Sequence, residues 1–431
     1  MNILAINPWI YDFAAYDFWL KPYGFLVLLS YLKKKNIHID YIDCLEQKIT
    51  KDSFGRGRYV HEIIKTPEVV AHIPRYFKRY GISPEQLEKS LPEKPIDAIL
   101  VTSSMTYWYP AIIDLAAILR RHYPGIPIYL GGTYATLCTE QAARAIDCDI
   151  IFTNDSLGDF FRTIGIDFDE EDFLKILPDY ELFYSHLDYV VLRTSWGCPH
   201  RCSFCAIEKL GVQYVTISPE EIIDFIDTYA RKNIKDFVFY DDALLYDQEY
   251  ITSLFKGIVR LGHKIRFHTP NALHLRYLTQ GIADLLKQCG FINPHFGLET
   301  LDRDLQKTWG DKVTTEDLIR AIGFLKNAGF KDGQFSLYLL LGYPGQDLTQ
   351  LKKDAVTLSG MGAKVSLAEF SAVPHTEIYA HFKEKLTDPL LHNNSLFCFF
   401  SEKKITEFWE VKEYVRNLNR KYAATHAFIN K

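Results

Sequence analysis

Residues 193–206 have the sequence Arg-Thr-Ser-Trp-Gly-Cys-Pro-His-Arg-Cys-Ser-Phe-Cys-Ala, which places Cys198, Cys202 and Cys205 in a C-x3-C-x2-C spacing. The β-branched and apolar residues from Tyr189 to Thr194 predict a strand that ends just before the first cysteine. Three thiolates so spaced can hold a 4Fe–4S cluster and leave one iron without a local protein ligand. The stretch therefore predicts a metal-binding loop at the end of a strand.

Three other chemistries compete for these cysteines. Structural zinc prefers four tetrahedral ligands, and the fourth would be His200, which lies two residues from Cys198 with a proline between them. A redox pair of Cys202 and Cys205 leaves Cys198 without a role. A ferredoxin-type carrier normally has a fourth cysteine nearby, whereas the next cysteine here is Cys289. The spacing alone leaves these alternatives open.

The bulk composition is that of a globular protein. The chain has 431 residues, of which 48% are hydrophobic and 24% charged, enough for two or three domains. A net charge of −5 gives no basic field that would attract nucleic acid. The eight cysteines form no disulfide-scaffold pattern in a chain of this size. We therefore expect no nucleic-acid partner and no disulfide framework.

The first residues predict a cytoplasmic location. They carry no charged leader, and Asn7 and Pro8 interrupt the apolar run before it reaches the length of a signal or membrane-spanning segment. We expect no membrane partner.

Residues 1–154 alternate short apolar runs with amphipathic helical patterns, which predicts a Rossmann-like, doubly wound parallel sheet. The expected strands are Asn2–Asn7, His38–Asp43, Asp97–Thr102, Ile126–Leu130 and Asp149–Thr153, with helices at Tyr23–Lys35 and Tyr109–His122. Residues from about 48 to 95 interrupt this alternation. They are polar, basic and helical in places, and we expect them to form an insertion over one edge. Residues 155–188 are predicted to be a linker with a short helix.

A second alternating series spans residues 189–376. The expected strands are Tyr189–Thr194, Lys235–Tyr240, Lys264–Thr269, Ile292–Leu298, Gln334–Leu341 and Lys364–Phe370, and the expected helices cover about 218–232, 248–260, 279–289, 314–328 and 346–360. Six strands in this length are too few for a complete barrel. They predict an open, partial (β/α)6 barrel of the TIM type. Residues 377–431 are predicted to be a helical extension with its longest helix at Thr406–Tyr422.

A cysteine triplet after the first strand of such a series resembles the radical S-adenosylmethionine (SAM) superfamily over about residues 189–376. The resemblance implies a 4Fe–4S cluster held by Cys198, Cys202 and Cys205, with SAM chelating the open iron. It further implies reductive cleavage of SAM to a 5'-deoxyadenosyl radical, which abstracts hydrogen from a substrate. An electron donor such as flavodoxin or ferredoxin is then expected as a partner. The substrate, whether a small molecule or a peptide, is not indicated.

The resemblance also suggests residues that contact the cofactor. Phe204 matches an aromatic position before the third cysteine, and packing under the loop is its plainer role. Asp241 or Asp242 would lie near the cofactor's amino group, although the family's usual Gly-Gly-Glu is absent and a structural or capping role is equally open. Glu299 would accept hydrogen bonds from the ribose or the amino group, with a buried ion pair as the alternative. Gly342 and Pro344 belong to a Gly-Tyr-Pro-Gly turn that permits close backbone approach.

Residues 1–154 are similar to the cobalamin-binding domain that is fused to many radical SAM enzymes. In that comparison Gly131 and Gly132 admit the nucleotide tail of the corrinoid, and Thr102 and Ser103 belong to a polar and aromatic wall. The Asp-x-His-x-x-Gly motif is absent, so a histidine below the cobalt is not expected. Whether cobalamin binds stays open. If it does, methyl transfer is the leading reaction. The alternative is a non-catalytic iron–sulfur or corrinoid-binding protein for sensing or delivery.

Overall fold

The computed structural model describes residues 1–211, 213–397 and 400–422. Its N-terminal part is a five-stranded parallel sheet in the order β10-β9-β8-β1-β3. The strands are β1 (Asn2–Asn7), β3 (His38–Asp43), β8 (Ala98–Val101), β9 (Ile128–Leu130) and β10 (Ile150–Ile151). All five coincide with expected strands, and β1 and β3 have the expected bounds. The predicted doubly wound sheet is confirmed.

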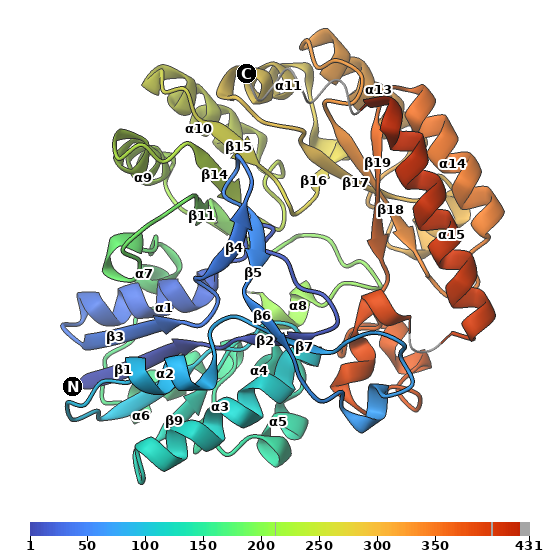
Figure 1. Cartoon of the computed structure of the whole chain (residues 1–431). Coiled ribbons are helices and arrows are strands. Elements are labelled where there is room, and N and C mark those ends of the chain that lie inside the picture. The colour runs from blue at the N-terminus through green and yellow to red at the C-terminus, as the bar shows by residue number, and fades with distance from the viewer. Residues whose placement is uncertain (212, 398–399, 423–431) are drawn as a thin grey trace.

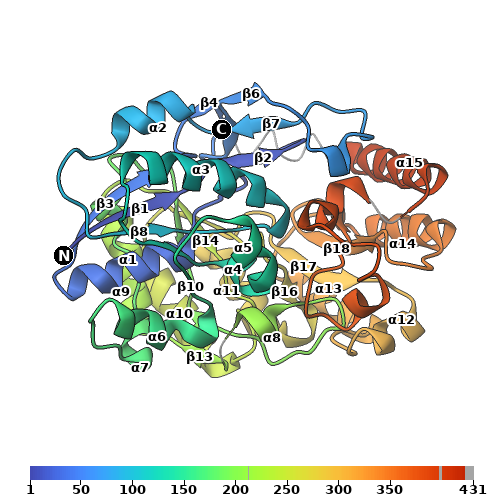
Figure 2. The same cartoon turned by 90° about the horizontal axis from the view of Figure 1, so that it is seen from below.

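This sheet is covered on both faces, as a parallel sheet must be. Helix α1 (Tyr23–Lys34) lies on one face and helix α3 (Tyr109–His122) on the other (Figure 2). Successive residues of β1 alternate between the two layers: Leu4 and Ile6 pack in the core with α3, whereas Ile3 and Ala5 pack with α1. Because both faces are buried, the strand is a continuous apolar run in the sequence.

The segment from 48 to 95 contains more strand than expected. It forms β4 (Lys48–Lys51), β5 (Gly57–Tyr59), β6 (His61–Ile63) and β7 (Lys78–Tyr80), and its one α-helix among the described residues is α2 (Pro84–Ser90). Strand β7 pairs antiparallel with β6 and with the distant β2 (Ile10–Asp12). Of the expected helical content, α2 is the part that forms an α-helix. Much of the remainder is strand, because β7 pairs with β2, which lies far away in the sequence.

The second series is the predicted partial barrel. Strands β11 (Val190–Leu192), β14 (Asp236–Phe239) and β15 (Arg266–His268) form one parallel sheet, and β16 (Leu273–His274), β17 (His295–Glu299), β18 (Ser336–Leu341) and β19 (Lys364–Glu369) form another. A parallel bridge between Phe267 and Phe291 links the two. The six expected strands are confirmed. The two-residue β16 was not expected.

Five helices cover the outside of this curved wall (Figure 1). They are α9 (Pro219–Arg231), α10 (Gln248–Leu261), α11 (Gln280–Cys289), α13 (Thr315–Asn327) and α14 (Leu348–Gly360), each within two residues of its expected bounds. On β17, Phe296 and Leu298 belong to the core beneath the helices. The register of β17 shifts between Gly297 and Glu299, and the Glu299 side chain pairs with Lys312 in the segment that follows the strand.

The rest of the chain ties the two parts together. Helix α15 (Glu402–Asn419) packs along α14 and β19. It begins four residues before the expected start of the last helix, Thr406. Residues 388–396, which we call the tail segment, cross to the N-terminal sheet. There the Tyr109 hydroxyl donates to Asp388 at 3.0 Å and the Asn393 amide donates to Asp12 at 2.9 Å. The predicted boundaries at 154, 188 and 376 stay predictions.

In the described ranges, no helix combines the length and the apolar content that crossing a bilayer requires.

Candidate functional site

The three cysteines lie on a loop closed by a short antiparallel ladder. Strand β12 (Ser195–Trp196) enters the loop and pairs with β13 (Val215–Thr216), which leaves it. Within the loop, the amide of Cys205 donates to the carbonyl of Cys202 at 3.0 Å, and helix α8 (Ile207–Leu210) follows. All three cysteines are free thiols. The loop therefore projects from the carboxyl end of β11, as predicted, where a barrel collects its functional groups.

Asp241, at the end of β14, holds the entry to this loop. Its Oδ1 atom accepts from the backbone amides and the hydroxyls of Thr194 and Ser195, at distances of 2.7 to 2.9 Å. Its Oδ2 atom is buried and has no hydrogen-bond partner in the described part of the chain. Burial raises the pKa of this carboxyl. One oxygen thus fixes the strand exit, and the other is available for a ligand.

The neighbouring Asp242 has a partner of its own. Its carboxylate accepts from the Arg193 guanidinium at 2.7 Å, and that guanidinium lies over the ring of Trp196, 5.0 Å from its centroid. Burial raises the pKa of Asp242, and the Arg193 charge opposes this shift. The sequence did not distinguish the two aspartates, but their surroundings differ. Asp242 is paired with an arginine, whereas Asp241 has one buried oxygen without a hydrogen-bond partner among the described residues.

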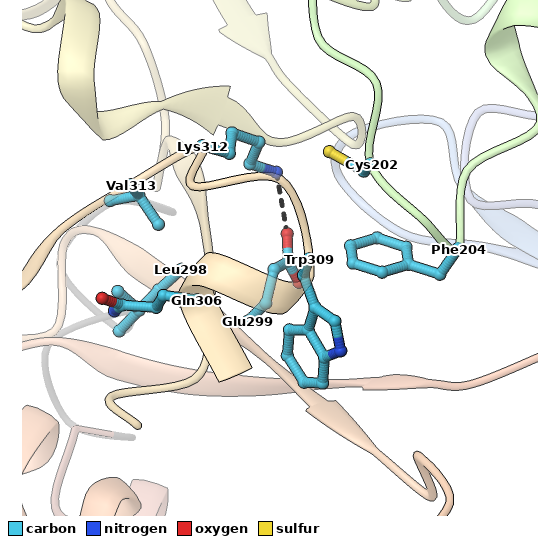
Figure 3. Close-up of a pocket in the computed structure, with 8 residues that line it drawn as sticks. All are labelled: Cys202, Phe204, Leu298, Glu299, Gln306, Trp309, Lys312 and Val313. Carbon is cyan, nitrogen blue, oxygen red and sulfur yellow. Dashed lines mark hydrogen bonds and ion pairs between the residues drawn. The ribbon is translucent and has the colours of Figure 1, made fainter. Parts of the chain in front are cut away.

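A pocket lies beside the cysteine loop at the end of β17 (Figure 3). Its lining residues are Cys202, Phe204, Leu298, Glu299, Gln306, Trp309, Lys312 and Val313. Glu299 closes β17 with a positive φ of 68° and forms an ion pair with Lys312, with 2.9 Å between Oε1 and Nζ. These two side chains are only 14% and 13% exposed. The ion pair that the sequence offered as the alternative role of Glu299 is present, and its predicted cofactor contact stays a prediction.

Aromatic rings form the floor of this pocket. Phe204 meets Trp309 edge to face at 5.7 Å, and Trp309 in turn packs on Tyr343 at 4.6 Å. Tyr343 lies between Gly342 and Pro344 in the predicted turn. A Cβ atom at Gly342 would lie 2.6 Å from the Phe397 ring, and φ there is 88°. The packing role of Phe204 is therefore present, and the absence of a side chain at Gly342 makes room for a residue beyond the tail segment.

Cys198 and Cys202 are half-buried, whereas Cys205 is exposed. Burial raises the pKa of Cys202 to about 11 and also raises the pKa of Cys198. The positive charge of Lys312 acts on all three thiols in the opposite direction. Each thiol must lose its proton to bind a metal, so metal binding here releases protons.

The geometry does not support the zinc and ferredoxin alternatives. Among the described residues, no three His, Cys, Asp or Glu side chains converge on one ion. His200 instead pairs through Nε2 with the Tyr277 hydroxyl at 2.9 Å. Cys289 is buried beneath the barrel helices and donates to the carbonyl of Phe255. A 4Fe–4S cluster does not need such convergence, because each thiolate binds a different iron. Three unpaired thiols on one loop fit that donor set.

The four residues predicted to contact a corrinoid lie together at the ends of β8 and β9. The Ser103 hydroxyl donates to the carbonyl of Gly131 at 2.6 Å and accepts from the amide of Ala135. A Cβ at Gly131 would meet the Phe152 ring at 2.3 Å. Thr102 is buried, and its amide donates to the carbonyl of Ile6 in β1. Contacts within the domain thus account for these residues, and their predicted cofactor role stays a prediction.

Replacing Gly132 by alanine tests this packing. Gly132 has a φ of 96°, and a Cβ there would lie 2.2 Å from the carbonyl oxygen of Ser103. We expect a loss of about 2 kcal/mol or more in the free energy of unfolding, from strain and overlap together. The matched control is Gly125→Ala, where φ is 81° and nothing lies within 4 Å, so that about 1 kcal/mol of backbone strain is expected. Equal urea midpoints for the two variants would contradict the close approach.

A second pocket lies where the order of the N-terminal strands reverses, between β1 and β8. This is the place where open parallel sheets bind ligands. It is lined by Asn7, Pro8, Trp9, Ile10, Leu45, Ser104, Trp108 and Ile112. The indole nitrogen of Trp9 is buried and lacks a partner among the described residues. The Trp108 indole donates to Asp12, which also binds Asn393, so the tail segment borders this pocket.

The sequence analysis missed Lys312, Gln306 and Trp309. They belong to the segment after β17, which carries helix α12 (Arg303–Thr308) and returns to the cysteine loop. A Cβ at Gly310 would lie 3.1 Å from the carbonyl oxygen of Arg201. No spacing motif marks Lys312. The one available signal was its position between a barrel strand and the next helix.

Comparison with known proteins agrees with this geometry. Residues 193–356, which include the cysteine loop and β12 to β18, match the radical SAM superfamily. The chain carries a radical SAM domain. Two solved structures resemble this chain over nearly its whole length, well beyond residues 193–356.

The radical SAM methyltransferase TsrM from Kitasatospora setae covers 89% of this chain, with a TM-score of 0.66 and 15% identity, and the chain covers 76% of it. The cobalamin-dependent SAM radical enzyme OxsB covers 92%, with a TM-score of 0.59 and 16% identity, and the chain covers 56% of it. At these identities the likeness establishes the fold. It extends over both the N-terminal parallel sheet and the partial barrel of this chain.

Among curated sequences, this chain is 30% identical over 242 residues to the ribosomal protein uS12 methylthiotransferase RimO of Chlorobium limicola, which corresponds to 54% of each chain. It is 23% identical over 177 residues to RimO of Hydrogenobaculum sp., covering 39% of this chain and 43% of that one. The chain thus spans about half the length of the curated relatives it matches.

Proposed function

We propose that this chain binds a 4Fe–4S cluster and SAM and uses them to abstract hydrogen from a substrate. The observation that carries the proposal is the group of three free thiols on one loop at the barrel mouth, beside a pocket with an inward-facing carboxylate. The match of residues 193–356 to the radical SAM superfamily supports it. When bound, these groups supply a 5'-deoxyadenosyl radical, which is chemistry that the side chains alone cannot provide.

The residues of the chain bind, orient and shield. Cys198, Cys202 and Cys205 would be the iron ligands. The free Oδ2 of Asp241 would accept from the ammonium of SAM, while Oδ1 keeps the loop entry in place. Phe204 and Trp309 form an apolar floor that keeps water from the reacting atoms. A one-electron donor of the flavodoxin or ferredoxin type reduces the enzyme.

We also infer a corrinoid at the second pocket, with methyl transfer as the reaction. The fold supports this, since TsrM and OxsB have the same arrangement and are described with cobalamin bound. The pocket at the strand reversal supports it too, because aromatic walls and an unpaired indole donor at Trp9 suit a large ring with polar side groups. Trp9, Ser104 and Trp108 would contact it.

The cluster and SAM are tested by anaerobic reconstitution. We expect about four irons per chain and, after dithionite and SAM are added, release of 5'-deoxyadenosine measured by liquid chromatography. A protein that takes up iron without cleaving SAM would instead be a sensor or delivery protein. A protein that takes up no cluster would contradict the proposal.

The corrinoid is tested by gel filtration after incubation with hydroxocobalamin, reading the visible absorbance that coelutes with the protein. We expect about one equivalent with the native chain and little with Ser104→Trp, because a large ring at this position fills the pocket. The control is Ser90→Trp, at an exposed position on α2. Equal retention by both variants would place the corrinoid elsewhere, and no retention by the native chain would remove it from the proposal.

A further inference from the structure

The pocket beside the cysteine loop contains one buried charge pair, and its cation is the unusual member. Lys312 lies in a segment between β17 and α13, and its side chain is only 13% exposed. Placing an ammonium in such a site is costly unless a partner compensates for the lost hydration. Glu299 is that partner, at 2.9 Å (Figure 3). An apolar residue would fill the same space without this cost, so the charge itself calls for an explanation.

The backbone places this cation against the cysteine loop. Gly310, two residues before Lys312, has a φ of 102°, and a Cβ there would lie 3.1 Å from the Arg201 carbonyl oxygen and 3.6 Å from the Cα of Cys202. Gly297 makes room on the other side, since its Cβ would come within 2.9 Å of both charged ends of the pair. Two glycines thus let the ammonium lie in the pocket that Cys202 also lines.

Other polar groups near the loop have partners of their own. Arg193 pairs with Asp242 at 2.7 Å, and Arg276 lies near Asp317 at 3.4 Å. His200 pairs with the Tyr277 hydroxyl at 2.9 Å, and its ring packs against His274. Lys312 and Glu299 are the ion pair that lines the pocket beside Cys202.

We propose that the Lys312–Glu299 pair sets the reduction potential of the cluster, with Lys312 favouring the reduced state and Glu299 opposing it. The inference rests on the proposed function, because it needs a cluster at Cys198, Cys202 and Cys205. Cluster potentials depend on net charge, hydrogen bonding and solvent exposure. Reduction adds one negative charge to a site that already holds three thiolates. A buried cation stabilises that charge, and a buried carboxylate destabilises it.

The redox step is a single electron transfer. The electron comes from an external one-electron donor, dithionite in the test or a flavodoxin-type protein in the cell, and the oxidised cluster gains one unit of negative charge. No bond to Lys312 or Glu299 forms or breaks. Lys312 is thus a positioning charge and not a catalytic residue.

The test is a redox titration of the reconstituted full chain in the absence of SAM, followed by electron paramagnetic resonance of the reduced cluster. For Lys312→Met we expect at least a tenfold lower ratio of reduced to oxidised cluster at a fixed potential, a shift of about 59 mV for one electron. For Glu299→Gln we expect a shift in the opposite direction. Lys312→Arg should keep the native potential, and the double variant should lie between the single ones.

The matched control is Lys307→Met, which removes a lysine that is 62% exposed on the neighbouring helix α12. Its potential should equal that of the native protein. Iron content is measured for every variant, so that a poorly folded protein is recognised, and Lys312→Gln serves where the methionine variant fails to fold.

Opposite shifts for the two members of the pair would support the inference. Equal potentials in all variants that carry full iron would overturn it and leave the proposed function intact. A change limited to SAM affinity, with the potential unchanged, would also overturn it and make Lys312 a cofactor ligand. A native chain that takes up no cluster would overturn this inference and the proposed function together.

Discussion

Alanine at any one of Cys198, Cys202 and Cys205 is expected to reduce iron from about four per chain to below one and to abolish release of 5'-deoxyadenosine. Each thiolate binds a separate iron, and the described part of the chain offers no substitute. Cys289 is buried on the far side of the barrel wall, and His200 is engaged with Tyr277. The measurement is iron and sulfide analysis together with visible absorbance after anaerobic reconstitution.

Cys148→Ala is the matched control, because this half-buried cysteine belongs to the N-terminal core, away from the loop. It should retain native iron content and activity. Full iron content in a single variant of the loop would show that the ligand set is wrong. Zinc in place of iron in the native protein would support a structural zinc site instead of a cluster.

The second large effect is expected at Asp241, where two substitutions should separate two roles. Asp241→Asn keeps an oxygen for Thr194 and Ser195 but removes the carboxylate and its unpartnered Oδ2. The fold and the cluster should survive. Affinity for SAM should fall roughly 10-fold to 150-fold, because a hydrogen bond to a charged group contributes about 1.5–3 kcal/mol. Equilibrium dialysis of SAM against the reconstituted protein measures the loss.

Asp241→Ala removes the acceptor as well. Two backbone amides and two hydroxyls then lose their partner at a buried position, with a cost of about 1–3 kcal/mol for each unsatisfied group. We expect a lower thermal midpoint and reduced iron uptake, since the loop entry is no longer fixed. If the asparagine variant bound SAM as tightly as the native protein, Asp241 would be a structural residue alone.

Much of the fold was predictable because its strands are buried on both faces. Runs such as Ile3–Ile6 and Leu337–Leu341 are nearly continuous in apolar side chains, and the helices between them have one apolar side. Strand β16 escaped prediction since two residues give no period. Strand β7 escaped for another reason: it pairs with β2, whose residues lie up to 70 positions away, as Tyr80 opposite Ile10 shows. Strand β6 pairs in turn with β7.

The proposed metal ligands could be predicted from the sequence, but the contacts around them could be predicted less well. Three cysteines at this spacing indicate a 4Fe–4S site. Whether Asp241 or Asp242 is available to a ligand depends on Arg193, which turns toward one of them only in the folded chain. Lys312 follows Glu299 by 13 residues, and the contact arises because the segment between them folds back along the cysteine loop.

The tail segment has a consequence for the synthesis of the protein. Asn393 hydrogen-bonds to Asp12 across 381 residues, and His392 contacts Thr106 across 286. At roughly 5–20 residues per second, the ribosome needs on the order of 20–75 s to make the residues between Asp12 and Asn393. Throughout that time the contacts that the tail segment makes beside the second pocket are not yet formed. That side of the N-terminal part is therefore accessible to a chaperone before residues 388–396 are made.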